Sequence, residues 1–174
     1  ASDVYKRQMD TYASSQRITV TNERSHLIMG FIDVIKERAK SSIKTIVLPE
    51  TEDMRTLEAA DKILKEGIAK LVLVGNEEAV KKSAAEGGFD ISGAQIVDPA
   101  TSEKTQGYID KLVELRQKKG MTPEQAKEIL LNQYLYYGVM MVKMGDADGM
   151  VSGACHSTAD TLRPVSYTHL RAHE

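Results

Sequence analysis

The residue types best suited to chemistry gather in one turn near the C-terminal end of the chain, over residues 151–164. This turn combines small residues with hydroxyl, imidazole and guanidinium groups. Small residues let the backbone approach an anion, and the polar groups add hydrogen-bond donors or positive charge. The pattern predicts an anion-binding loop. Its candidate ligand-binding residues are Ser152, Gly153, His156, Ser157, Thr158 and Arg163.

A structural explanation of the same turn is also open. Ser157 can cap a following helix, with Asp160 three residues later as its reciprocal partner, and His156 is then an ordinary buried polar residue. Because a capped helix start is also where phosphates bind, the two explanations are compatible.

Cys155 and His156 are adjacent, which suggests a thiol nucleophile beside a base. Adjacent side chains of an extended segment point in opposite directions, so this pairing is geometrically poor and a structural role for Cys155 is favoured. Since the chain has one cysteine, no intrachain disulfide is possible, and the composition suits a reducing cytosol.

Two further turns follow apolar runs. The first, residues 49–53, is acidic and suggests a metal site, but carboxylates are favourable at a helix N-terminus, so capping is favoured over metal binding. The second, residues 74–77, has one glycine where a dinucleotide-binding fingerprint needs three, and its glutamates would repel a pyrophosphate. The sequence therefore predicts no metal site and gives little support to a dinucleotide cofactor.

The elements that must position these turns alternate between short apolar strands and amphipathic helices. Strands are expected at residues 45–48, 70–74, 95–97 and 148–153. Helices are expected at residues 31–39 and 53–66, from Asn76 to Gly87, over the stretch before Gly120, and from Thr122 to Met141. This alternation predicts an α/β fold with a parallel-type sheet wrapped by helices.

Local signals mark several helix ends. Gly67 is expected just beyond the end of one helix, and the Asn76 side chain is expected to cap the next. Thr122, Pro123 and Gln125 combine a cap, a proline at the first helical position and a capping-box partner. The helix that starts there carries an apolar stripe expected to be core or a subunit contact.

Composition and charge exclude several classes of protein. The chain has 174 residues, of which 41% are hydrophobic and 28% charged, as in a folded globular protein. A net charge of -2 favours neither nucleic acid nor an anionic membrane. No apolar run approaches the ~20 residues that span a bilayer, so cytoplasmic residence is the default expectation.

Both ends of the chain differ from its middle. Residues 1–28 are polar and lack an apolar period, so the folded protein is expected to start at Met29, with a non-native leader before it. Residues 165–174 resemble translated adapter sequence and are expected to be a non-native tail, which leaves residues 29–164 as the folded segment. His169 and His173 are therefore not candidate ligands.

Five phrases of this middle segment resemble the phosphate acetyltransferase and phosphate butyryltransferase family. They cover residues 46–57, 73–76, 96–99, 114–120 and 148–164, and the last is the most specific and favours the acetyl enzyme. The resemblance implies a fold similar to isocitrate and isopropylmalate dehydrogenases. It also implies a chain roughly twice as long, with two α/β domains around an active-site cleft, usually as a homodimer.

The resemblance also assigns roles to residues. Arg116 and Arg163 match arginines tied to coenzyme A or phosphate binding, and residues 152–158 match a loop that lines the cleft. The alternatives are a solvated helix-end arginine for Arg116 and a capping contact for Arg163. The family's serine, arginine and aspartate nearest the reacting thiol would lie in a second half absent here, so this sequence identifies no catalytic residue and the fragment alone is expected to be inactive.

The implied reaction is direct acetyl transfer between coenzyme A and phosphate, with coenzyme A as a substrate and without a metal or a tightly bound cofactor. A base would take the thiol proton, and arginines and turn amides would stabilise the charge on the intermediate and on the departing phosphate. Two alternatives stay open. One is phosphate butyryltransferase; the other is a non-catalytic acetyl-coenzyme A-sensing region like that of some malic enzymes, which the start near Met29 disfavours.

Overall fold

The computed structural model describes residues 30–169, which belong to two units divided after Ser42. In the first unit, residues 30–41 are helical, as predicted. The apolar side chains of this helix are largely exposed: Phe31, Ile32 and Ile35 are 66%, 45% and 49% exposed. The described part of this unit offers no second element for them to pack against. The predictions for residues 1–28 lie outside the described residues.

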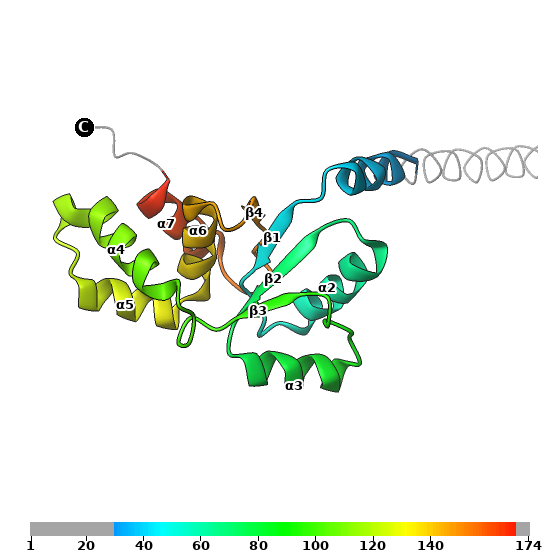
Figure 1. The fold of residues 1–174 in the computed structure, drawn as a ribbon, viewed down its shortest axis with the longest axis horizontal. Coiled ribbons are helices and arrows are strands. Elements are labelled where there is room, and N and C mark those ends of the chain that lie inside the picture. The colour runs from blue at the N-terminus through cyan, green and yellow to red at the C-terminus, as the bar shows by residue number, and fades with distance from the viewer. Residues whose placement is uncertain (1–29, 170–174) are drawn as a thin grey trace, which may run out of the picture. The chain divides into compact units, whose positions relative to one another are not determined.

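The second unit, from Ile43, is built on a four-stranded parallel sheet (Figure 1). Its strands are β1 (Thr45–Leu48), β2 (Lys70–Val74), β3 (Gln95–Val97) and β4 (Gly149–Met150), in the order β3-β2-β1-β4. β1 is central, with β2 and β4 as its neighbours, and every pairing is parallel. The predicted α/β class is confirmed.

Helices follow the strands, and their ends match the capping signals. The described helices of this unit are α2 (Met54–Glu66), α3 (Glu77–Gly87), α4 (Thr105–Arg116), α5 (Pro123–Asn132), α6 (Tyr134–Met144) and α7 (Thr158–Thr168), with a short 3₁₀ turn at Gln117–Lys119. Asp53 and Asn76 cap α2 and α3 with their side chains, and Thr122 forms the expected capping box with Gln125. Gly67 ends α2 in the left-handed conformation, as predicted.

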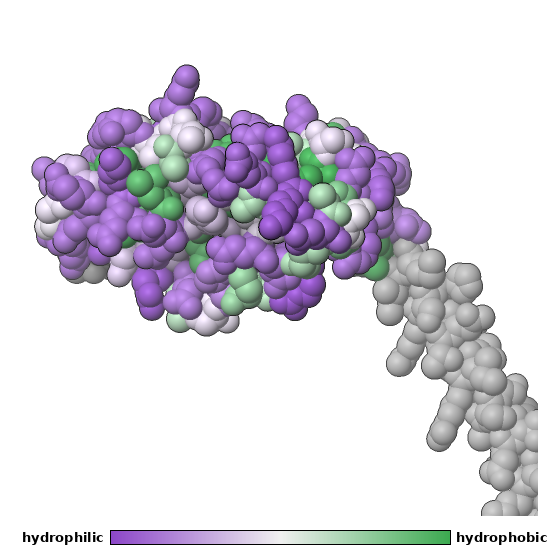
Figure 2. Space-filling view, turned by 90° about the horizontal axis from the view of Figure 1, so that it is seen from below, coloured by the Kyte–Doolittle hydropathy of each residue, from purple (hydrophilic) through white to green (hydrophobic). Residues whose placement is uncertain are grey.

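The sheet separates two apolar clusters, because successive strand residues face opposite sides. Leu48, Leu71 and Leu73 pack with α2 and α3 on one face. Val47 and Val72 pack with α4, α5 and α6 on the other, where the predicted apolar stripe is largely buried in the core. Hydrophilic residues cover most of the surface seen in Figure 2, with apolar residues in small separate patches. Among residues 30–169, no helix has the length and apolarity to cross a membrane.

Two predicted elements were wrong in extent. The helix expected from Thr122 to Met141 is two helices, because Gln133 adopts an extended backbone (φ −128°, ψ 90°) between α5 and α6. The strand expected at residues 148–153 is reduced to Gly149–Met150. Val151 N–H still donates to Val47 O of β1, but the following amides bond to a side chain in place of a strand.

Helix α7 continues beyond Pro164 to Thr168 and therefore includes part of the expected tail. Pro164 is buried within the helix, and the Thr168 hydroxyl donates to Pro164 O at 2.9 Å. Whether residues 165–169 belong to the native protein stays a prediction, and residues 170–174 lie outside the described residues.

Candidate active site

A hollow of about 260 Å³ lies where the turn after β1, the junction of α5 and α6, and the start of α7 meet. It is lined by Pro49 and Glu52, by residues 132–136, and by His156, Asp160 and Arg163. Two predicted ligand-binding residues, His156 and Arg163, thus share one hollow with two carboxylates. An anion that enters it would meet an imidazole and a guanidinium, and would compete with Asp160 for Arg163.

The start of α7 is capped as the structural explanation predicted. Ser157 Oγ accepts a hydrogen bond from Asp160 N at 3.2 Å and donates one to Asp160 Oδ2 at 2.6 Å. The hydrogen bond from Ser157, together with the charge of Arg163, holds the pKa of Asp160 below its ordinary value, although burial opposes the shift. Arg163 Nη1 lies 3.6 Å from Asp160 Oδ1 across one helical turn. Because both side chains are about half exposed, this ion pair is weak and can be exchanged for a ligand.

The turn between β4 and α7 does bind a negative charge, but the charge is the chain's own. Glu50, which follows β1, is 2% exposed and accepts from four consecutive backbone N–H groups. Its Oε2 accepts from Gly153 N at 2.6 Å and Ala154 N at 2.8 Å; its Oε1 accepts from Cys155 N at 3.1 Å and His156 N at 3.0 Å. The amides expected to face a substrate anion therefore already have a carboxylate partner.

These bonds determine the ionisation of Glu50. Burial alone would raise the pKa of its carboxyl group, because burial disfavours the charged form. The hydrogen bonds from Ala154, the His156 ring, Cys155 and Gly153 outweigh burial and hold the pKa far below the ordinary 4.5. Glu50 is therefore a carboxylate at neutral pH, with no proton to donate.

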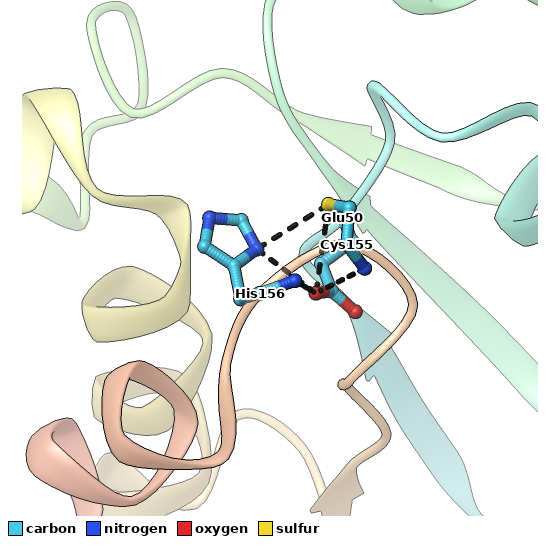
Figure 3. A group of neighbouring side chains, drawn as sticks. All are labelled: Glu50, Cys155 and His156. Carbon is cyan, nitrogen blue, oxygen red and sulfur yellow. Dashed lines mark hydrogen bonds and ion pairs between the residues drawn. The ribbon is translucent and has the colours of Figure 1, made fainter.

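Cys155 and His156 lie together beside Glu50 (Figure 3). Cys155 Sγ is 3.4 Å from His156 Nδ1 and 3.6 Å from Glu50 Oε1, so the expectation that the two side chains point apart was wrong. The turn is not extended here, because its amides all converge on one carboxylate. The alternative in which His156 is an ordinary buried polar residue does not hold either, since its side chain is 39% exposed.

Although Cys155 is exposed, its electrostatic surroundings disfavour a thiol nucleophile. Burial and the negative charge of Glu50 raise the pKa of Cys155, because both disfavour the thiolate. A reactive cysteine needs the opposite environment, with positive charge that lowers its pKa. Electrostatics, and not side-chain direction, thus argue against a thiol nucleophile at Cys155.

Glu50, Cys155 and His156 are also the described residues that could present three ligand atoms to a metal ion. Their oxygen, sulfur and nitrogen types would suit zinc. However, the lone pairs of Glu50 are already used by four amides and the imidazole. A cation would have to displace these N–H donors from the carboxylate, so the geometry favours a hydrogen-bonded clamp of Glu50 on residues 153–156 over a metal centre.

The other predicted residues lie apart from the hollow. Ser152 lines a second hollow of about 250 Å³ beside α2, with its buried Oγ lacking a hydrogen-bond partner among the described residues. Arg116, at the end of α4, stacks its guanidinium 4.0 Å from the centre of the Tyr167 ring. Gly153 adopts a φ of +114°, which suits glycine, and Thr158 is the exposed first residue of α7.

Sequence reasoning missed two residues of this region. Glu50 was interpreted as one of several helix-start acids, although Asp53 alone caps α2. Arg55 pairs with Asp53 and donates from Nη2 to Ala154 O, so α2 also holds the turn. The available signal was position: Glu50 follows one strand and the turn follows another, and carboxyl ends of parallel strands meet at one sheet edge.

Comparisons with known proteins agree on one group of enzymes. The family model described as phosphate acetyl/butaryl transferase matches residues 30–169. Over 137 residues the chain is 56% identical to phosphate acetyltransferase of Acetivibrio thermocellus and 54% identical to that of Thermoanaerobacterium thermosaccharolyticum. These matches cover 79% of the chain but 40% and 41% of the relatives, so the chain spans less than half of their length.

Solved structures give the same picture. A phosphotransacetylase from Staphylococcus aureus matches with a TM-score of 0.72 and 40% identity, over 80% of this chain and 42% of its own. One from Streptococcus pyogenes matches with a TM-score of 0.75 and 36% identity, over 81% of this chain and 42% of its own.

Proposed function

Because the chain belongs to the phosphate acetyl/butaryl transferase family, we propose that it supplies one wall of an active site that exchanges acetyl between coenzyme A and phosphate. The naming of the curated relatives as phosphate acetyltransferases supports acetyl as the transferred group. Coenzyme A, acetyl phosphate and phosphate are the proposed substrates. The rest of the reacting centre would come from the part of the family's length that this chain does not span.

The observation that carries this proposal is the hollow that joins His156 and Arg163. Its volume of about 260 Å³ is below the ~300–1,000 Å³ typical of sites for larger ligands. It suits phosphate or acetyl phosphate, whereas whole coenzyme A would need the surface outside it. We assign the phosphate group to this hollow, within reach of the Arg163 guanidinium and the His156 imidazole.

The proposed chemistry is one displacement at the acetyl carbon. The coenzyme A thiol, with an ordinary pKa of ~8.5, loses its proton to a base outside this chain, and its sulfur forms a bond to the acetyl carbonyl. The tetrahedral intermediate then breaks its carbon–oxygen bond, and phosphate leaves with the electron pair. Arg163 would stabilise the charge that gathers on the departing phosphate, and His156, whose Nδ1 is bonded to Glu50, would accept a hydrogen bond at Nε2 from a protonated phosphate oxygen.

The hydrogen bonds of this region reduce the set of groups that we assign to substrate binding, compared with the expectation from the sequence. The N–H groups of residues 153–156 are bonded to Glu50, so they are not assigned to substrate. Ser157 is similarly committed to the cap of α7. The proposed substrate contacts in the hollow are therefore the side chains of His156 and Arg163. Arg116, Ser152 and Thr158 stay proposed contacts on the family resemblance, whereas Gly153 and Ser157 are proposed to shape the loop.

A cytoplasmic location and a homodimeric assembly are part of the same proposal. The location is supported by the single cysteine, which suits a reducing compartment. The dimer rests on the family resemblance alone. Size-exclusion chromatography with light scattering on the chimera described next would test the dimer.

A chimera tests the activity. Residues 30–164 would replace the matching segment of the Acetivibrio thermocellus relative, and coenzyme A-dependent formation and use of acetyl phosphate would be assayed. We expect activity in the chimera, and an Arg163→Ala change should raise KM for phosphate at least about tenfold. Arg38→Ala, which removes the same charge from the first unit, is the control. A folded chimera without activity, or an Arg163→Ala variant with unchanged kinetics, would contradict the proposal.

A further inference from the structure

Glu50 is a buried, ionised group for which the proposed reaction has no direct use. It is 2% exposed, its oxygens accept hydrogen bonds from the loop, and its Oε1 lies 2.9 Å from His156 Nδ1, but Glu50 itself does not line the hollow. A buried carboxylate is costly unless its charge is satisfied by donors. The chain satisfies this one with four amides and an imidazole that come from more than 100 residues away.

The contact with His156 determines which ring nitrogen carries a proton. An ionised carboxylate only accepts hydrogen bonds, so Nδ1 must be the donor. In the neutral ring the second nitrogen, Nε2, then carries the lone pair, so it can accept a hydrogen bond from the P–O–H group of hydrogen phosphate. Figure 3 shows it pointing away from Glu50 and Cys155, and the His156 side chain lines the hollow that also contains Arg163.

The four amide bonds act on the same side chain through the backbone. They fix residues 153–156 against the end of β1, which is rigid because Val47 and Leu48 are fully or nearly fully buried in the core. A loop held at both its backbone and its imidazole keeps fewer conformations. His156 is thereby preorganised, so little ordering cost remains when a ligand binds.

We propose that Glu50 is a positioning residue, whose carboxylate holds the 153–156 loop and directs His156 Nε2 at the phosphate group of the substrate. This inference rests on the proposed function and deepens it. Glu50 itself touches no substrate; it acts through His156. The alternative is that Glu50 anchors the loop for stability alone, without effect on substrate binding.

Two substitutions in the chimera separate these possibilities. Glu50→Gln keeps the side-chain size but removes the charge and places an amide donor among the loop donors. His156→Asn keeps a donor near the position of Nδ1 and removes Nε2. Glu58→Gln is the matched control, since it removes a charge from α2 at a half-exposed position paired with Lys62.

Amide hydrogen exchange measures whether Glu50 holds the backbone of residues 153–156, independently of enzymatic activity. Glu50→Gln should speed exchange at residues 153–156 by about tenfold or more, whereas His156→Asn and Glu58→Gln should leave the backbone protection of this loop intact. Unchanged exchange in Glu50→Gln would overturn the clamp, even if the chimera proved inactive and the proposed function failed.

Steady-state kinetics then test whether Glu50 positions His156 for substrate binding. We expect Glu50→Gln and His156→Asn each to raise KM for phosphate by about tenfold to 100-fold, with a smaller change in KM for coenzyme A. Because Glu50 acts through His156, the double variant should raise KM for phosphate by less than the product of the two single increases. Glu58→Gln should match the parent chimera. Faster exchange in Glu50→Gln with an unchanged KM for phosphate would overturn positioning and leave Glu50 a structural anchor. An active chimera in which His156→Asn keeps its KM would exclude Nε2 as the phosphate contact.

Discussion

The turns that follow β2 and β4 solve the same problem by different means. Each ends a parallel strand and leads toward a helix, so each must satisfy backbone groups that leave the sheet. After β2, Gly75 is buried and donates to Val97 O at 3.0 Å, and Asn76 caps α3 at once by accepting from Ala79 N at 3.1 Å. After β4, seven residues separate the strand from α7, and their amides turn to Glu50.

The difference is one of locality. The turn after β2 combines a local cap, Asn76 to Ala79, with bonds to Val97 and Asp98 at the end of the strand that follows it along the chain. The turn after β4 depends on one carboxylate more than 100 residues earlier. A local turn is short and rigid but offers little room for a ligand. A longer turn clamped from elsewhere can present His156 to a hollow while its backbone stays fixed.

The largest expected effect comes from removing the clamp itself. Glu50→Ala deletes the acceptor of four amides and one imidazole, and hydrogen bonds to charged groups contribute more than neutral ones. We expect the free energy of unfolding to fall by about 2–4 kcal/mol, measured by urea denaturation. Glu58→Ala, which breaks only a surface pair, should cost less than about 1 kcal/mol. Equal losses for the two variants would remove the contrast between the turns.

Acid should weaken the turn after β4 in a way that traces to the same residue. The pKa of Glu50 in the folded chain lies below its ordinary 4.5, so the unfolded chain takes up the proton first. Its contribution is complete above about pH 4.5 and is lost as the pH falls below that value toward the folded pKa. Urea denaturation from pH 7 to pH 3 should give a shallower decline in Glu50→Gln than in the parent. Parallel declines would contradict this assignment.

The turn after β2 should respond to size and not to charge. A Cβ on Gly75 would collide with Thr51 Oγ1, which donates to Val74 O at 2.9 Å, and would lie 3.1 Å from Val80 Cγ2. Gly75→Ala is therefore expected to lower the free energy of unfolding by about 1–3 kcal/mol. Gly107→Ala in α4, where nothing lies within 4 Å, should instead stabilise by about 0.5–1 kcal/mol. Thermal unfolding of both variants tests this, and a neutral Gly75→Ala would refute the packing argument.

The smallest effect is expected for the local cap. Asn76→Ala removes the acceptor of the Ala79 amide and the donor to Asp98, at an exposed helix start. We expect a loss of about 1 kcal/mol in the free energy of unfolding, with hydrogen exchange at residues 153–156 unchanged. Faster exchange in that loop would contradict this prediction, because it would show that the two turns are coupled.

The features that were predicted correctly from the sequence depend on interactions between residues close together in the chain. The strands at Thr45–Leu48 and Lys70–Val74 follow from β-branched apolar runs, and the caps at Asn76 and Thr122 follow from side chains that bond within three residues. The break at Gln133 was missed because apolar spacing continues through it from α5 into α6. Periodicity alone does not report a change of backbone direction between two helices.

The candidate site was predictable in its residue types but not in its contacts. Residues 151–164 were recognised as a turn able to surround an anion, and His156 and Arg163 do line one hollow. The identity of the anion held by the backbone was not predictable, because an acid such as Glu50 beside a helix start has a sufficient local explanation. The pairing of Cys155 with His156 was misjudged because the turn was treated as extended.

The sequence by itself determined the alternation of strands and helices, the caps, and the family to which the phrases of residues 46–164 belong. Only the tertiary structure decided that β4 lies beside β1, and with it that Glu50 meets the turn before α7. The reason is physical: helix periods and caps depend on residues a few positions apart, whereas strand order depends on which apolar faces pack together. That packing places the Glu50 carboxylate beside this turn.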